Sequence, residues 1–116
     1  STEPPAKRQR AAEVIKQRPL RVACAASKGR KLSLEDVPVL APALNGDDRV
    51  AFYAILDGHG GRNCASLAAR RLVTHIAARI ADAHTSNEVK EAIKSSFLRC
   101  EIDVLNEAAA SGWDDG

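Results

Sequence analysis

The sequence predicts an α+β fold, in which an antiparallel β-hairpin is followed by two long amphipathic helices. Two apolar runs, 37–44 and 49–56, flank a turn signal at 45–48. Behind them, residues 63–83 and 88–110 repeat their apolar positions at helical spacing. The chain has 116 residues, 45% of them hydrophobic and 28% charged, which fits a single small domain with a modest core.

The N-terminal residues 1–19 contain three prolines and many charges, so we expect a flexible basic tail. Its cluster Lys7–Arg10 suits a nuclear import receptor, although a merely solvated tail explains it equally well. No apolar run is long enough for a membrane span, and no secretory signal precedes the domain, so we expect a protein of the cytoplasm or nucleus. The net charge of +2 is too small to indicate nucleic-acid binding.

Three segments have strand character. Residues 20–27 alternate partially between apolar and polar side chains, which predicts a first strand. Pro38 limits the second apolar run to an edge strand, a bulge or the start of a strand, because proline cannot donate a ladder hydrogen bond. The run Val50–Leu56 does not alternate, which predicts a strand buried on both faces. The turn signal Asn45–Asp48 joins the last two segments into a hairpin.

Two helices follow a glycine-rich turn. The first is predicted over 63–83 and the second over 88–110, with a capping signal at 85–87 and an end near Gly112. His75 and His84 have no acidic or cysteine partner at ligand spacing, so both are interpreted as helix-surface or core residues.

Three cysteines, Cys24, Cys64 and Cys100, are odd in number and stand in apolar surroundings. They are interpreted as reduced core residues of an intracellular protein. The pair Asp114–Asp115 is interpreted as solvated loop acids rather than as a second metal site.

Three carboxylates stand at strand ends. Glu35 and Asp36 begin one arm of the predicted hairpin, and Asp57 ends the other. Because these two ends are neighbours in an antiparallel pair, we expect the three acids to converge. Converging carboxylates repel each other unless a cation neutralises them, and hard oxygen ligands suit Mg²⁺ or Mn²⁺. The glycines 58, 60 and 61 would then present Asp57 and His59 at the end of a rigid strand.

Two motifs resemble those of the metal-dependent serine/threonine protein phosphatases of type 2C. Tyr53–Gly61 looks like the signature of that family, and Gly29–Asp36 is similar to its earlier motif of glycine, basic pair and Met-Glu-Asp. The resemblance covers 20–116 and is closest to integrin-linked-kinase-associated and plant-type members. It implies the N-terminal segment of a catalytic domain whose fold is a four-layer α-β-β-α sandwich.

The resemblance also implies a reaction and a role for each motif residue. Phosphoserine and phosphothreonine in substrate phosphoproteins would be hydrolysed by a hydroxide bridging two divalent ions, Mg²⁺ or Mn²⁺, in a monomeric full domain. Asp57 would bridge the ions, the Gly58 carbonyl and Glu35 would bind them directly, and Asp36 would bind through water. His59 would protonate the leaving oxygen. This scheme agrees with general two-metal and acid catalysis.

The chain departs from the family pattern in two ways. Lys31 stands where the family has a phosphate-gripping arginine, and a lysine neutralises phosphate only as a point charge. Arg30 lies one step earlier, where its side chain would turn to the other sheet face. The family's domain is also more than twice as long, so we expect the 116-residue chain to be inactive alone. The alternative is a non-catalytic, phosphatase-like binding module, whereas a nucleic-acid binder lacks support.

Overall fold

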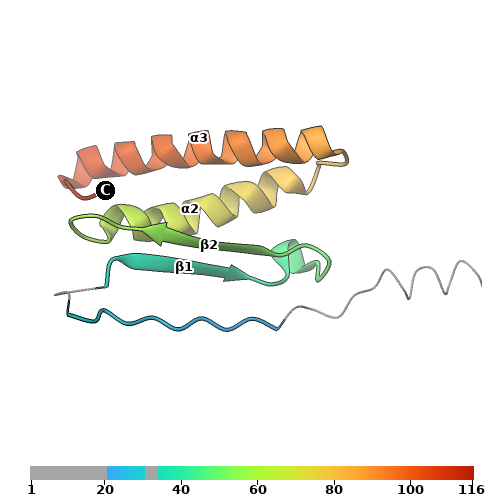
Figure 1. The fold of residues 1–116 in the computed structure, drawn as a ribbon. Coiled ribbons are helices and arrows are strands. Elements are labelled where there is room, and N and C mark those ends of the chain that lie inside the picture. Colours follow the sequence, from blue (N-terminus) through green and yellow to red (C-terminus); the bar gives the residue numbers. More distant parts are fainter. Residues whose placement is uncertain (1–20, 31–33) are drawn as a thin grey trace, which may run out of the picture.

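The computed structural model describes residues 21–30 and 34–116. Its elements follow the order β1 (Asp36–Ala41), the 3₁₀ turn η1 (Leu44–Gly46), β2 (Phe52–Asp57), α2 (Asn63–Ile80) and α3 (Ser86–Ser111). Figure 1 shows three stacked layers: the sheet of β1 and β2, then α2, then α3. The predicted α+β fold, a hairpin followed by two long helices, is confirmed. The predicted tail 1–19, with its cluster Lys7–Arg10, lies outside the described residues.

The hairpin is antiparallel, and its register places Asp36 opposite Asp57 and Ala41 opposite Phe52. Each strand stops three residues short of the predicted turn, because the connection is a wider loop that contains η1. Asn45 adopts a left-handed conformation (φ 57°), which asparagine tolerates better than most residues. Its side-chain Nδ2 donates to the Ala77 carbonyl of α2 at 2.7 Å. The loop is therefore anchored to a helix as well as joining two strands.

The two faces of the sheet differ in burial. Val37 and Val39 of β1 are buried, and alternate residues of β2 pack against them from the same face. On the other face Tyr53 is 36% exposed and Ile55 is 72% exposed. The prediction that Val50–Leu56 is buried on both faces was therefore wrong. Within the described residues α2 covers only one face of the hairpin, and burial alternates along β2.

Helix α2 supplies the centre of the core. It begins at the predicted residue and ends at Ile80, three residues earlier than expected. Its side chains contribute to two apolar clusters, one against the sheet and one against α3. The buried positions recur at helical spacing and are Cys64, Ala65, Leu67, Ala69, Leu72 and Ile76.

Helix α3 packs mainly on α2 rather than on the sheet (Figure 1). The Thr85 hydroxyl caps its start by accepting from the Glu88 N–H at 3.1 Å. Gly112, in the left-handed region (φ 72°), ends it, and the Trp113 N–H returns to the Ala108 carbonyl. Both ends agree with the predicted signals to within two residues. In the described part of the chain, no helix is long and apolar enough to cross a membrane.

The segment before the hairpin differs from prediction. Residues 21–27 are exposed and form no strand. A strand needs a neighbour for its backbone N–H and C=O groups, and in the described chain β1 and β2 pair only with each other. Cys24 is exposed on this segment, so its assignment to the core was wrong. Cys64 and Cys100 are buried and reduced, as predicted.

Candidate functional site

The predicted acidic residues meet at one end of the hairpin. The register sets Asp36 directly across from Asp57, with Glu35 preceding Asp36 and Gly58 following Asp57. Directly opposed residues of an antiparallel pair project from the same face, so both aspartates lie on the exposed face of the sheet. The hairpin pairing that the sequence predicted therefore brings the backbones of Asp36 and Asp57 together.

Gly58 joins the two acidic motifs through the main chain. It is buried, and a Cβ atom added to it would lie 2.5 Å from the Glu35 carbonyl oxygen and 2.8 Å from the Gly61 carbonyl oxygen. No side chain fits such a space, so only glycine allows the Glu35 backbone to approach the Asp57 turn this closely. Gly60 and Gly61 then turn the chain with φ of 73° and 142°, values that other residues rarely adopt.

His59 stands at the tip of this turn. Its side chain is 76% exposed, and its Nε2 atom lies 4.0 Å from Oδ1 of Asp57, whose side chain is 74% exposed. The imidazole is therefore open to a substrate approaching from solvent, beside the acid at the end of β2. A group that must deliver a proton to a departing oxygen needs this accessibility.

The C-terminal residues hold the backbone of the same loop. His59 and Gly116 exchange two main-chain hydrogen bonds, His59 N–H to Gly116 O at 2.7 Å and Gly116 N–H to His59 O at 2.8 Å. The Asp115 carboxylate accepts from the Cys64 N–H at 3.0 Å, which caps the start of α2. Asp115 is thus not the solvated loop acid that the sequence suggested. An acid followed by glycine is too common a pattern to have revealed this role.

The Cys64 thiol belongs to the same contact. Its Sγ donates to the Asp115 carbonyl oxygen at 3.0 Å. Burial raises the pKa of the Cys64 thiol, and the nearby Asp115 charge raises it further. The thiol is therefore held in its protonated, hydrogen-bond-donating form.

The donor atoms at the hairpin end suit a hard divalent cation. Glu35, Asp36 and Asp57 offer carboxylate oxygens, and Gly58 offers a carbonyl oxygen, the ligand types that Mg²⁺ and Mn²⁺ prefer. Across residues 21–30 and 34–116, however, no three His, Cys, Asp or Glu side chains are gathered closely enough to hold a metal ion. Carboxylates repel each other unless a cation lies between them. Without a cation, their side chains are therefore free to point apart even where the backbone register places the residues side by side.

The predicted phosphate-binding pair is described only in part. Arg30 is exposed in the turn before the hairpin, whereas Lys31 lies outside the described residues. Because Gly29 has a left-handed φ of 57°, Arg30 follows a tight bend.

A second polar cluster joins the two helices. His75 Nε2 lies 2.6 Å from Asp103 Oδ2, and Arg79 Nη1 lies 3.2 Å from His75 Nδ1. His75 is a largely buried histidine of α2, within the helix-surface or core role predicted for it, and its acidic partner comes from the neighbouring helix 28 residues later. Hydrogen bonding to His75 lowers the pKa of Asp103 below its ordinary value, with smaller contributions from the charges of Arg99 and Arg71.

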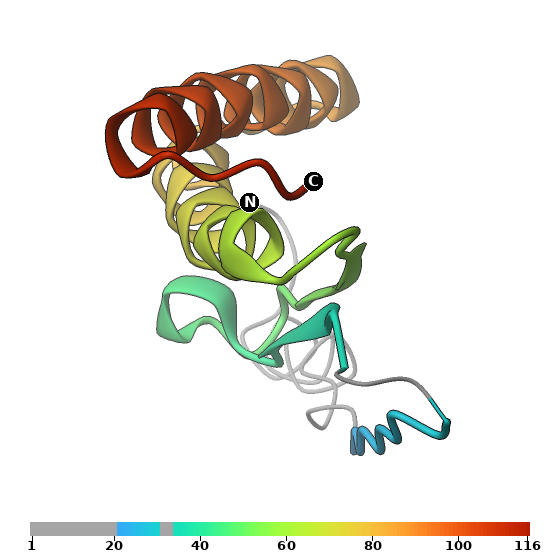
Figure 2. The same ribbon diagram turned by 90° about the vertical axis from the view of Figure 1, so that its left-hand side faces the viewer.

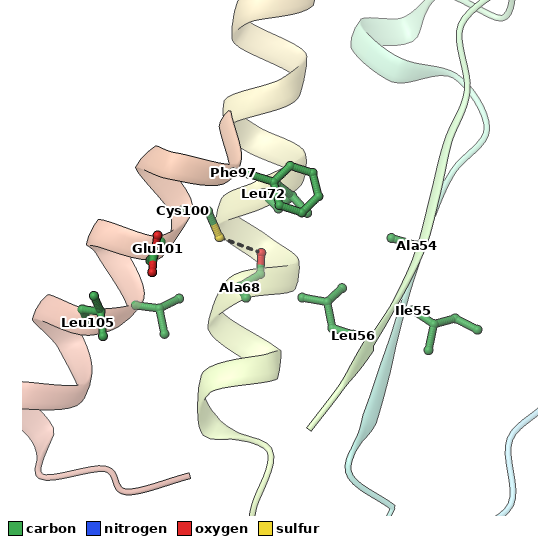
Figure 3. A pocket seen from close by; sticks show the side chains of 10 residues that line it. Ala54, Ile55, Leu56, Ala68, Leu72, Phe97, Cys100, Glu101 and Leu105 are labelled. Atoms are coloured by element: carbon green, nitrogen blue, oxygen red, sulfur yellow. Dashed lines mark hydrogen bonds between the residues drawn. The ribbon is translucent and has the colours of Figure 1, made fainter. Parts of the chain in front are cut away.

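An apolar groove of about 360 Å³ opens between β2 and the two helices (Figure 3). Leu56 points into it from β2, Leu72 from α2 and Phe97 from α3. The Cys100 Sγ beside it donates to the Ala68 carbonyl at 3.6 Å, as the dashed line in Figure 3 marks. None of the acidic site residues lines this groove. It is a packing feature of the three layers and not part of the hairpin-end site.

Comparison with known proteins identifies the family. The family model for protein phosphatase 2C matches residues 20–116, which is most of the chain. The chain belongs to the protein phosphatase 2C family. Both sequence motifs that suggested this family lie within the matched region, and its plant-type members are among the similar proteins.

Similar proteins come from plants and from a mammal. Probable protein phosphatase 2C 32 of Oryza sativa subsp. japonica is 33% identical over 78% of this chain and 24% of its own length. Probable protein phosphatase 2C 14 of Arabidopsis thaliana is 32% identical over 72% of this chain and 19% of its own length. Probable protein phosphatase 1N of Mus musculus is 33% identical over 73% and 22%. The chain thus spans about a fifth to a quarter of the length of these relatives. No solved structure matches it.

Proposed function

We propose that the whole protein hydrolyses phosphoserine and phosphothreonine esters in phosphoproteins, with Mg²⁺ or Mn²⁺ as cofactor. One observation carries this proposal: the register sets Asp36 against Asp57 while the Glu35 backbone packs on Gly58. The acidic residues of both motifs that resemble the phosphatase signature thereby lie at one end of the hairpin. Membership of the protein phosphatase 2C family supports the reaction class.

Each residue would contribute by its chemistry. The carboxylates of Glu35, Asp36 and Asp57 and the Gly58 carbonyl would hold the cations. Two such ions, when bound, supply the charge that activates a water molecule and neutralises the phosphate. His59, exposed beside Asp57, would give a proton to the departing serine or threonine oxygen.

Two basic residues would receive the substrate phosphate. Arg30 presents an exposed guanidinium after the Gly29 bend, and Lys31 follows it in sequence. Lysine contributes a charge without the paired hydrogen bonds of arginine, so we propose a weakened phosphate grip if Lys31 is the principal contact.

The 116-residue chain would be inactive on its own. Mg²⁺ requires about six ligands in near-ideal geometry, and two ions cannot be enclosed by three carboxylates and one carbonyl. The remaining oxygens would have to come from water, substrate or other parts of the whole protein. We propose further that residues 20–116 are the N-terminal segment of a phosphatase domain and that residues 1–19 are a tail before it. An intracellular location, and recognition of Lys7–Arg10 by a nuclear import receptor, belong to the same proposal.

A matched pair of variants tests the function in the whole protein. Phosphate release from a phosphothreonine peptide is measured with Mn²⁺, with Mg²⁺ and after chelation. Asp57→Asn should lower kcat/KM at least 100-fold, because an amide binds a hard cation far more weakly than a carboxylate does. Asp48→Asn makes the same chemical change at the far end of the hairpin, where the side chain is exposed, and should leave activity unchanged.

The same measurement distinguishes the enzyme from the non-catalytic binding module. A whole protein that binds phosphopeptide but releases no phosphate with either ion would contradict the enzyme and favour the non-catalytic binding module. Full activity of Asp57→Asn would instead show that hydrolysis does not depend on the hairpin-end site.

A further inference from the structure

The Asp115–Gly116 segment makes four hydrogen bonds to the loop that follows β2 and to the first turn of α2. Two run between the main chains of His59 and Gly116, and two run from the Cys64 N–H and Sγ to Asp115. Figure 2 shows this segment returning from the end of α3 towards the start of α2. Residues more than fifty positions apart thus form one contact.

Asp115 makes its contacts through both side chain and main chain. Its Oδ2 atom satisfies the Cys64 N–H, one of the N–H groups left free at the start of every helix. The carboxylate charge also faces the positive end of the α2 dipole. Asp115 thereby links the first turn of α2 to the chain that runs into Gly116 and pairs with His59.

The glycine turn is shaped to accept Asp115. A Cβ atom added to Gly61 would lie 3.2 Å from the Asp115 Cβ and 3.4 Å from its Cγ. Gly61 also has a φ of 142°, a conformation that favours glycine, and any larger residue would crowd the Asp115 side chain. The last glycine of the motif therefore packs on the Asp115 side chain, which is partly buried there.

We propose that Asp115 is a positioning residue for the phosphatase reaction. By capping α2 and anchoring Gly116 against the His59 main chain, it fixes the loop that presents Asp57 and His59. In the described chain the hydrogen bonds of Asp115 go to Cys64 and none joins it to the proposed metal-binding carboxylates or to the imidazole, so we infer that it acts through the loop backbone. The inference rests on the proposed function for its catalytic consequence, whereas the anchoring is independent of it.

Three variants of the whole protein test the proposal. Asp115→Ala removes the carboxylate acceptor, and Asp115→Asn retains an oxygen acceptor while losing the charge. Asp114→Ala is the matched control, because Asp114 is the adjacent acid, is exposed, and makes no hydrogen bond within the described chain. For each variant, amide hydrogen exchange is measured at His59 and Cys64, together with kcat and KM at saturating Mn²⁺. The Cys100 amide in α3 serves as the reference for global stability.

Asp115→Ala should speed exchange at His59 and Cys64 about fivefold relative to Cys100, the factor expected for the loss of one helix cap. We expect kcat to fall by a similar factor or more, because proton donation depends on the placement of His59. Asp115→Asn should recover most of the protection and of kcat, since its side-chain oxygen can accept the same hydrogen bond. Asp114→Ala should match the wild type.

Three results would overturn the proposal. Equal exchange in Asp115→Ala and Asp114→Ala would show that the carboxylate does not anchor the loop. Faster exchange with an unchanged kcat would show that the anchored loop does not govern the reaction. An Asp115→Asn variant as impaired as Asp115→Ala would indicate that the charge is needed, as for a metal ligand. Failure of the proposed function itself is recognised separately, because the wild-type protein would then release no phosphate.

Discussion

Gly58 is the residue through which the two acidic motifs touch. Its missing side chain lets the Glu35 carbonyl oxygen occupy space that any Cβ would fill, at a distance of 2.5 Å. Because Gly58 is not among the residues with positive φ, the requirement comes from packing and not from conformation. The approach of Glu35 to the end of β2 therefore requires a residue without a Cβ atom at position 58.

Gly58→Ala should destabilise the protein by about 1–3 kcal/mol, the usual cost of inserting a carbon into a packed site. It should also weaken Mn²⁺ binding in the whole protein, because the Glu35 backbone must move away from Asp57. Calorimetric titration with Mn²⁺ measures the second effect.

Gly46→Ala is the control for Gly58→Ala. Its added carbon meets nothing within 4 Å, but the left-handed φ of 74° makes it costly by about 1 kcal/mol. It should lower stability without changing Mn²⁺ affinity. Wild-type affinity in Gly58→Ala would show that the Glu35–Gly58 contact does not shape the metal site.

Helices α2 and α3 are joined by a polar contact as well as by apolar packing. The side chains of His75 and Asp103 are 18% and 20% exposed, and Arg99 adds an ion pair with Nε 3.8 Å from Asp103 Oδ1. Because Arg79 donates to Nδ1 of His75, the neutral ring carries its proton on Nε2 and donates it to Asp103. The contact thus holds the two helices at a set position along their lengths.

Asp103 should make the stability of this helix pair depend on acid pH. The His75 hydrogen bond lowers the pKa of Asp103 below its ordinary 3.8, so the folded state binds this proton less readily than the unfolded state. The stabilisation is present above that ordinary value and is lost as the pH falls through the lower folded pKa. Asp103→Asn should therefore unfold at lower urea than the wild type at about pH 5, and the difference should shrink below about pH 3.

Urea unfolding curves at several pH values check this prediction. Glu101→Gln is the control on the same helix, since Glu101 is exposed and should show no such pH-dependent difference. A difference between Asp103→Asn and the wild type that stays constant with pH would contradict the role given to the carboxylate.

The whole molecule is organised around α2, which contacts the sheet on one side and α3 on the other (Figure 1). Leu72, only 3% exposed, lies in the cluster that joins η1, α2 and α3. The sheet and α3 both pack on α2, so a side chain removed at Leu72 leaves a cavity between the layers.

Leu72→Ala should destabilise the 116-residue chain by about 2–5 kcal/mol, because it removes buried methyl groups and leaves a cavity. Ile55→Ala removes a comparable amount of apolar side chain from the exposed sheet face, where Ile55 is 72% exposed, and should cost about 0.5 kcal/mol or less. Urea midpoints of the two variants compare them directly. Equal losses would show that the exposed sheet face carries as much of the stability as the centre of the core.

Local patterns in the sequence predicted the hairpin, both helices, the capping residues of α3 and the pairing of the strand ends that carry Asp36 and Asp57. Each depends on interactions within a short stretch: helical periodicity, a hydroxyl three residues before an N–H, or a turn that returns one strand beside the other. Two motifs in the right order were also enough to indicate the protein phosphatase 2C family, which the comparisons confirm.

The tertiary structure alone decided which side chains are covered and which distant groups meet. Val50–Leu56 is apolar throughout, but whether its second face is buried depends on what lies beyond the hairpin, and here Ile55 is exposed. The partners of His75 and Cys64 come from 28 and 51 residues away, at distances along the chain where no local pattern exists. Periodicity records the preference of a segment, whereas burial and long-range hydrogen bonds depend on how separate segments pack together in space.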